Sequence, residues 1–215
     1  MARVELEHFT IGNSYGGNQD WFRTFMMRIG GCAAETACDS SLYFALHRGL
    51  DGVYPFDKAK LTKADYVAFA HRMEQYLWPR MSGVNRLELF IDGYAKCLKD
   101  CGVEVLSMTA FDGSEPYEKA ADVLRRQIDA GYPVPTLILN HRDKAMKDYV
   151  WHWFLINGYD QKEDADDLLV KAVSYSEFQW LSLQRLWNTG HDVKGGFVLY
   201  KLNENKEERH NGDNG

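Results

Sequence analysis

The sequence lacks the features that mark several common classes of protein. No apolar run reaches the length of a membrane span, and lysine and arginine form no cluster. The 25 basic residues are outnumbered by 31 acidic ones, and the formal net charge of −6 argues against a nucleic-acid surface. The first residues, MARVELEHFTIGN, have neither the basic end nor the apolar stretch of a signal peptide. We therefore expect a cytoplasmic protein with no membrane or nucleic-acid partner.

Cysteine is also scarce. The 4 cysteines among 215 residues do not make a disulfide framework for a chain of this size. Cys97 and Cys101, in YAKCLKDC, would project from one face of a helix, which is a poor arrangement for a bridge between them. They would supply half of a zinc site, but no Cys-x-x-Cys pair or nearby histidine pair completes it. We expect reduced thiols and no metal.

The composition that is present is that of an ordinary globular domain. Hydrophobic residues make up 45% of the chain and charged residues 26%, and the sequence contains no internal repeat. The C-terminal stretch NENKEERHNGDNG has no apolar side chains to bury. We therefore expect a single domain over residues 1–202 and a disordered polar tail over 203–215.

Helical signals dominate the first two thirds of the chain. In Ala33–His47 the apolar residues recur at helical spacing, while Glu35, Asp39 and Ser40 lie off that stripe. Capping and stop signals predict three further helices. They run from Thr62 to about Trp78, over Leu87–Cys101 before Gly102, and within DGSEPYEKAADVLRRQIDAGYP, with Ser114 near the cap, Pro116 in the first turn and Gly131 past the end.

Strand signals dominate the remainder. The predicted strands are GVEVLSM (102–108), PVPTLIL (133–139), YVWHWFLINGY (149–159), LLVKAVS (168–174) and GGFVLYKL (195–202). The third is a central strand covered on both faces, and the fourth pairs with it as a hairpin across the acidic loop DQKEDADD. SEFQWLSLQRLW (176–187) is predicted to be helical. Helices early and a mostly antiparallel sheet late predict an α+β fold.

Cys32 is a candidate nucleophile. It follows Gly30 and Gly31 and begins the helix predicted over Ala33–His47. The first turn of a helix has unpaired N–H groups and a partial positive charge, which favour the thiolate and lower the pKa of a cysteine. The alternative is a cysteine that is simply packed in the core.

His152 is the best candidate for the base that such a thiol needs. It lies inside the most apolar predicted strand, where a polar ring is costly without a partner. Alternation places it on the sheet face of Phe154 and Ile156 and places Trp153 on the other face. Taken alone, its position favours a core histidine bonded to a backbone carbonyl. The other histidines have polar or terminal neighbours and are predicted to lie on the surface, with His191 kept as a rival: His8, His47, His71, His141, His191 and His210.

Three stretches taken in order, GGNQDW, GGCAAETA and WHWFLINGYD, resemble papain-like cysteine peptidases, in particular the branch of bacteriocin leader-processing peptidases. IDAGYPVPTLI is similar to the stretch before the histidine strand of that branch, and the likeness extends over most of residues 9–202. The resemblance implies a papain-like fold, with N-terminal helices packed on a mostly antiparallel sheet and with no metal or organic cofactor.

The resemblance also implies a role for each matching residue. Cys32 would be the nucleophile and His152 the general base. Gln19 would line the oxyanion hole beside the backbone N–H of Cys32, with Asn18 as a second donor. Without the family, Gln19 would be a polar surface residue of a loop.

The sequence departs from the family at the third catalytic position. The family has Asn or Asp on the strand after the histidine, where this chain has Ser174, with Ser176 and Glu177 as possible stand-ins. A hydroxyl accepts from a ring N–H but stabilises an imidazolium less than a carboxylate does. Trp151 and Ala33 also stand where the family usually has glycine.

These residues predict a cysteine peptidase-like hydrolase that cleaves a peptide or related acyl bond of a peptide or protein substrate through a thioester on Cys32. Two alternatives stay open. In one, the same residues act as an acyltransferase, with an amine or thiol resolving the thioester. In the other, the chain is a non-catalytic member of the fold that binds a peptide or protein. The sequence gives no indication of the oligomeric state of the protein.

Overall fold

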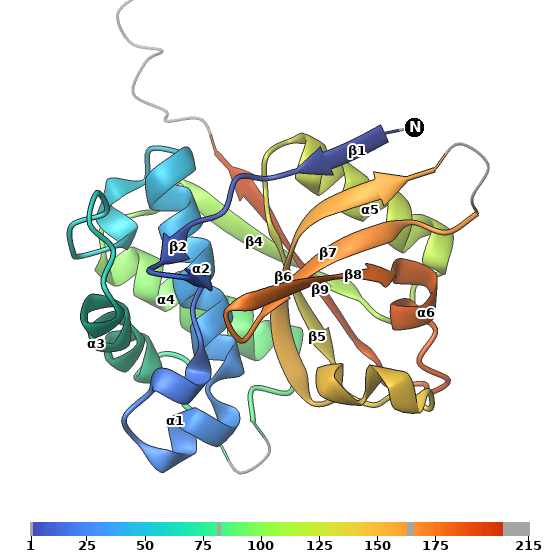
Figure 1. Ribbon diagram of the computed structural model, residues 1–215, viewed down its shortest axis with the longest axis horizontal. Coiled ribbons are helices and arrows are strands. Elements are labelled where there is room, and N and C mark those ends of the chain that lie inside the picture. Colours follow the sequence, from blue (N-terminus) through green and yellow to red (C-terminus); the bar gives the residue numbers. More distant parts are fainter. Residues whose placement is uncertain (1, 81–82, 163–165, 204–215) are drawn as a thin grey trace, which may run out of the picture.

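A seven-stranded antiparallel sheet forms the centre of the protein in this computed structural model, which describes residues 2–80, 83–162 and 166–203 (Figure 1). The strands run in the order β4-β9-β5-β6-β7-β8, and β1 pairs with the end of β6. Their bounds are β1 Ala2–Glu5, β4 Leu106–Asp112, β5 Val134–Ile138, β6 His152–Gln161, β7 Leu169–Ser174, β8 Glu177–Ser182 and β9 Gly195–Leu202. A separate two-stranded ribbon joins β2 (Thr10–Ile11) to β3 (Ser14–Tyr15).

The helices lie on both faces of this sheet. They are α1 Phe25–Gly30, α2 Cys32–His47, α3 Lys63–Glu74, α4 Leu87–Asp100, α5 Tyr117–Asp129 and α6 Leu183–Trp187, with 3-10 turns at η1 Gln19–Trp21, η2 Asp51–Val53 and η3 Lys144–Tyr149. The α+β class and the antiparallel sheet are thus as the sequence predicts. Four of the helices and most of the strands match predicted segments within a few residues. The helix α1 was not predicted.

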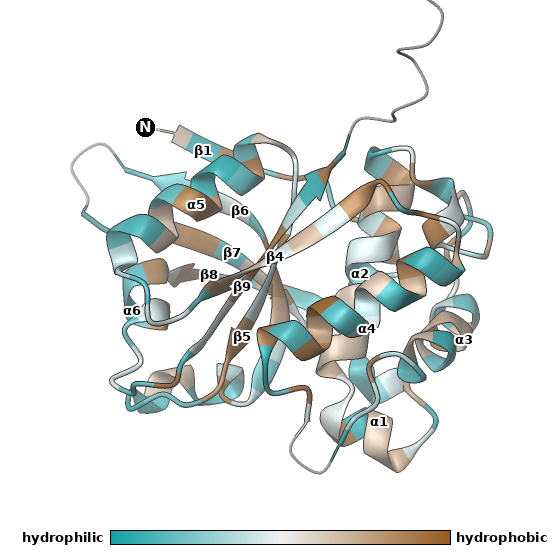
Figure 2. Ribbon diagram, turned by 180° about the vertical axis from the view of Figure 1, so that it is seen from behind, coloured by the Kyte–Doolittle hydropathy of each residue, from teal (hydrophilic) through white to brown (hydrophobic). Residues whose placement is uncertain are grey.

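Two hydrophobic cores lie on opposite faces of the sheet. One joins α2, α3 and α4 to residues such as Leu137, Trp153 and Val198. The other joins α5 and α6 to residues such as Phe154 and Ile156 (Figure 2). Consecutive residues of β6 therefore enter different cores, which is the alternation predicted for a strand covered on both faces.

The helix α2 is buried almost all round rather than along one stripe. From Cys32 to Ala45 all of its residues are buried. The sequence placed Glu35, Asp39 and Ser40 off the apolar stripe, but the structure encloses them too, because the N-terminal segment and α3 cover the side of α2 that faces away from the sheet. Small side chains on every face allow this close approach.

One predicted helix is wrong. SEFQWLSLQRLW forms the strand β8 before the short helix α6. Ser174 pairs with Glu177, so β7 and β8 are joined by the two-residue turn Tyr175-Ser176. Both turn residues have positive φ, 51° and 65°, as the tight hairpin turn that matches strand twist requires. Pairing with β7 therefore outweighs the local helical pattern. Part of the acidic loop, 163–165, and residues 204–215 of the predicted tail lie outside the described residues.

Candidate active site

Cys32 stands at the first residue of α2, directly after the turn that ends α1. Gly31 makes this turn possible, because a side chain there would place its Cβ 2.3 Å from the carbonyl oxygen of Met27. The cysteine borders a cleft of about 320 Å³. The other residues that line this cleft are mostly apolar: Met26, Ile29, Gly30, Arg80, Gly83, Val84, Asn85, Leu137, Leu139, Trp151 and Trp153.

Burial controls the ionisation of the Cys32 thiol. Burial is the main cause and, with a smaller contribution from the nearby Glu35, raises the pKa of the thiol to about 11, although the nearby backbone N–H of Trp153 acts to lower it. The expected lowering of the pKa by the helix terminus is therefore not met, because desolvation outweighs it. At pH 7 the group is a thiol.

His152 begins β6 and is held by two neighbours. Its Nε2 lies 2.6 Å from the hydroxyl oxygen of Ser174, and its ring stacks on that of Tyr175 with centroids 5.1 Å apart and planes within 9°. The ring also stacks on Phe154, on the face opposite Trp153. Burial lowers the pKa of His152 to about 4, so the imidazole is neutral at pH 7. Trp151, the residue before it, has a positive φ of 53°.

The helix that begins at Cys32 and the strand that begins at His152 meet at this point. The backbone N–H of Trp153, the next residue after the histidine, lies near enough to the Cys32 sulfur to lower the pKa of the thiol. Tyr175 also lies near both, since its ring stacks on His152 and the pKa of its hydroxyl is raised to about 12 by burial, by Glu35 and, less strongly, by the ionised form of Cys32. Within the described residues, no hydrogen bond joins the sulfur directly to the imidazole.

Gln19 is buried rather than on the surface, with 4% of its area exposed. It opens η1, and Asn18 caps this turn by accepting the N–H of Asp20 at 2.8 Å. The backbone N–H of Gln19 donates to Glu35 at 3.1 Å, and its side-chain Nε2 donates to the carbonyl of Arg28 at 2.9 Å. The side-chain oxygen of Gln19 is buried without a partner in the described structure.

The remaining candidates lie apart from the imidazole. Ser176 donates its hydroxyl to the carbonyl of Gly17 at 3.1 Å, and Glu177 is exposed. His191 lies in the segment between α6 and β9 and does not line the cleft that contains Cys32. Among the predicted partners of His152, the structure therefore brings Ser174 to the ring. The catalytic roles of these residues stay predictions.

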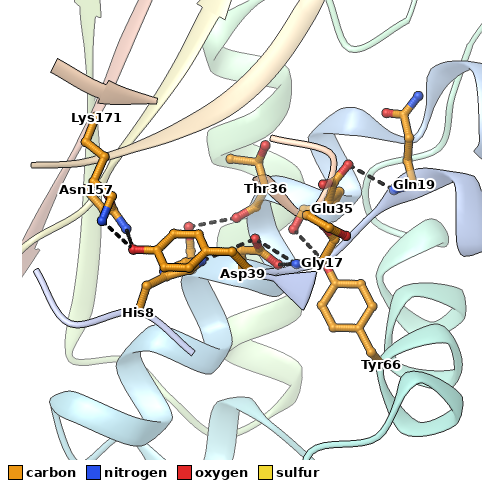
Figure 3. Close-up of polar contacts among 12 residues, drawn as sticks. His8, Gly17, Gln19, Glu35, Thr36, Asp39, Tyr66, Asn157 and Lys171 are labelled. Carbon is orange, nitrogen blue, oxygen red and sulfur yellow. Dashed lines mark hydrogen bonds and ion pairs between the residues drawn. The ribbon is translucent and has the colours of Figure 1, made fainter. Parts of the chain in front are cut away.

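A buried polar cluster around Glu35 and Asp39 of α2 was missed by the sequence reasoning (Figure 3). Asp39 accepts the N–H of Gly17 at 3.2 Å and the hydroxyl of Tyr66 at 2.7 Å. His8, predicted to lie on the surface, has a fully buried side chain with Nε2 3.8 Å from Asp39. Glu35 lies one turn earlier on α2. The available signal was the run of small residues on every side of these two carboxylates, which predicts close packing all round.

The chain matches no known family model, and neither a curated protein nor a solved structure is significantly similar to it.

Two further properties of the described residues bear on its chemistry. All four cysteines carry free thiols, and in the described ranges no group of three or more His, Cys, Asp or Glu side chains is arranged to hold a metal ion. No helix in that part of the chain has both the length and the apolar character needed to cross a membrane.

Proposed function

We propose that the protein is a cysteine hydrolase of papain-like fold that acts on a peptide or related acyl bond. The observation that carries the proposal is the meeting of the Cys32 end of α2 with the His152 end of β6 beside an apolar cleft. The bond from His152 Nε2 to Ser174 supports it, because a hydrogen-bonded ring nitrogen fixes the imidazole and leaves Nδ1 to accept a proton.

The proposed reaction starts from two neutral groups, since the pKa of Cys32 is about 11 and that of His152 about 4. The sulfur attacks the acyl carbon while its proton moves to Nδ1 of His152. The side-chain amide of Gln19 and the backbone N–H of Cys32 stabilise the negative oxygen that forms. The tetrahedral intermediate then collapses to a thioester, and His152 returns the proton to the leaving group.

Water resolves the thioester in a hydrolase, and an amine or thiol resolves it in an acyltransferase. The cleft supports a substrate with an apolar group next to the reacting carbonyl. Ile29 and Trp151 line it and are 61% and 54% exposed, an arrangement typical of a surface that is covered by a ligand. Free thiols suit a reducing compartment, so we place the protein in the cytoplasm.

An acylation assay tests the proposal. The Cys101→Ser variant removes the exposed thiol and serves as the background. p-Nitrophenyl hexanoate should release a burst of one nitrophenolate per chain and leave its acyl group on Cys32, as mass spectrometry of peptides would show. Cys32→Ser should abolish the burst, and His152→Phe should slow it about a hundredfold or more. Cys38→Ser, on the same helix, is the matched control and should leave it unchanged.

A second candidate function is peptide binding without chemistry, favoured by the burial and raised pKa of Cys32. It predicts that an apolar peptide quenches tryptophan fluorescence equally in the background protein and in Cys32→Ser. The absence of any acyl group on Cys32 in the ester assay, together with such binding, would replace the first function by this one.

A further inference from the structure

The carboxylate of Glu35 lies beside two separate segments of the chain. Its Oε2 accepts the backbone N–H of Gln19 at 3.1 Å. The backbone N–H of Tyr175 lies near enough to this carboxyl to lower its pKa, against the larger effect of burial, which raises it. Gln19 comes from η1, before α2, whereas Tyr175 is in the turn between β7 and β8. Figure 3 shows the Gln19 contact, with the side chain of Gln19 directed away from Glu35. The carboxylate therefore holds the main chain of Gln19, while the Gln19 side chain is directed elsewhere, with its Nε2 donating to the carbonyl of Arg28.

Burial of the Glu35 carboxylate costs folding free energy. Glu35 is 5% exposed, and none of the ion pairs among the described residues gives it a cationic partner. Burial and the neighbouring Asp39 raise its pKa well above 4.5. Glu35 also lies close enough to Cys32 to raise the pKa of that thiol. A carboxylate that hinders ionisation of a nucleophile needs another reason to be there.

The two segments carry groups of the proposed site. Gln19 holds the amide proposed for the oxyanion hole, and Tyr175 holds the ring that covers His152. A shift of either segment relative to the start of α2 would change the distance of these groups from Cys32, and an oxyanion donor acts only when it is placed correctly.

We propose that Glu35 is a positioning residue of this site, which sets the Gln19 amide against the first turn of α2 for oxyanion stabilisation. This inference rests on the proposed function. In this proposal Glu35 forms no bond to the substrate and acts through the backbone of Gln19.

The proposal predicts opposite effects on two reactions of the same thiol. Alkylation by iodoacetamide needs the thiolate but forms no oxyanion. Acylation by p-nitrophenyl hexanoate starts from the neutral thiol, passes its proton to His152 and forms an oxyanion. In Glu35→Gln the negative charge is lost, so Cys32 ionises more easily and alkylation at pH 8 becomes roughly threefold faster. The new amide has one oxygen for the two N–H groups beside it, those of Gln19 and Tyr175, and faces the other with its own N–H₂ group, which disturbs this arrangement. Acylation therefore becomes at least about tenfold slower.

The experiment measures both rates on Cys32 by mass spectrometry in the Cys101→Ser background. Glu5→Gln is the control, because Glu5 is a carboxylate outside the proposed site with a defined partner, Lys171 at 2.8 Å, and its loss should leave the ratio of the two rates unchanged. Glu35→Asp is the second variant. It retains the charge but withdraws the carboxylate, so acylation should fall while alkylation stays near the background rate.

A double-mutant cycle separates positioning from folding. Gln19→Ala should slow acylation as Glu35→Gln does, and the double variant should be no slower than the slower single variant, because both changes remove the same amide. Additive losses, or a parallel fall of both reactions with a lower melting temperature, would overturn the positioning role. An unchanged rate ratio in both Glu35 variants would overturn it as well. If the background protein itself fails to acylate Cys32, the proposed function fails first, and this outcome is distinct from the others.

Discussion

Replacing His152 by phenylalanine should change how the stability of the protein depends on pH. The pKa of His152 falls from 6.5 to about 4 on folding because the ring is buried. Between these values the unfolded chain binds a proton that the folded chain does not, so stability falls as the pH falls. His152→Phe keeps a ring to stack on Tyr175 and Phe154 but does not titrate.

The expected size follows from the two pKa values. The full penalty is about 3 kcal/mol, reached near pH 4, and about 2 kcal/mol of it develops between pH 7 and pH 5. Over that range the wild-type protein should therefore lose about 2 kcal/mol of unfolding free energy relative to His152→Phe. The contributions of other acid-sensitive groups cancel in this difference.

Urea unfolding followed by tryptophan fluorescence at pH 7, 6 and 5 measures the difference, with m-values compared to ensure that the unfolded states match. Ser174→Ala is the control, because it removes the hydroxyl from Nε2 but retains the imidazole, and it should keep the wild-type pH slope. If the unfolding free energies of wild type and His152→Phe changed with pH in parallel, the ring would be solvated in the folded state. This result would refute the burial from which we infer that the imidazole is neutral.

Two further predictions concern the frame around the site. Gly17→Ala should destabilise the protein by about 3 kcal/mol, because the new Cβ would lie 1.8 Å from the hydroxyl of Tyr66. Gly52→Ala is the control: the nearest atoms to its Cβ lie at 3.3 and 3.4 Å, so the free energy of unfolding should change by no more than about 1 kcal/mol. Equal melting temperatures for the two variants would contradict this. Thr62→Ala removes the N-cap of α3, which accepts the N–H of Asp65 at 3.1 Å, and should lower the urea midpoint by the equivalent of about 1 kcal/mol with the same m-value. An unchanged midpoint would show that the cap contributes nothing.

Much of the fold could be read from local patterns. Spacing and caps predicted α2 and α3, and the continuous apolar run predicted β6 as a strand between two cores. The start of α2 at Cys32 and the apolar strand around His152 were also visible, because helix starts and buried strands leave signals within a few residues. The nearness of these two ends was expected only from the family resemblance.

The features of the fold and the site that were not predicted depend on contacts between segments that are distant in the sequence. Glu35 and Asp39 lay off the predicted apolar stripe, and their burial was not foreseen. Helical periodicity gives no information about a second layer, here the segment around Gly17, that covers the other side of α2. The strand β8 was mistaken for a helix because its partner β7, rather than its own spacing, decides its conformation. The raised pKa of Cys32 likewise reflects how deeply its neighbours enclose it, and the sequence gives no measure of that depth.

The enclosure of α2 bears on how relatives of this protein can be found. A helix with one solvent-exposed face tolerates substitutions on that face, which occur at every third or fourth position of its sequence. The helix α2 offers no such side over Cys32–Ala45, so nearly every substitution meets a neighbour. The stretch CAAETACDSSLYFA should thus diverge more slowly than the exposed β8, and it is the segment with which to search for distant homologues.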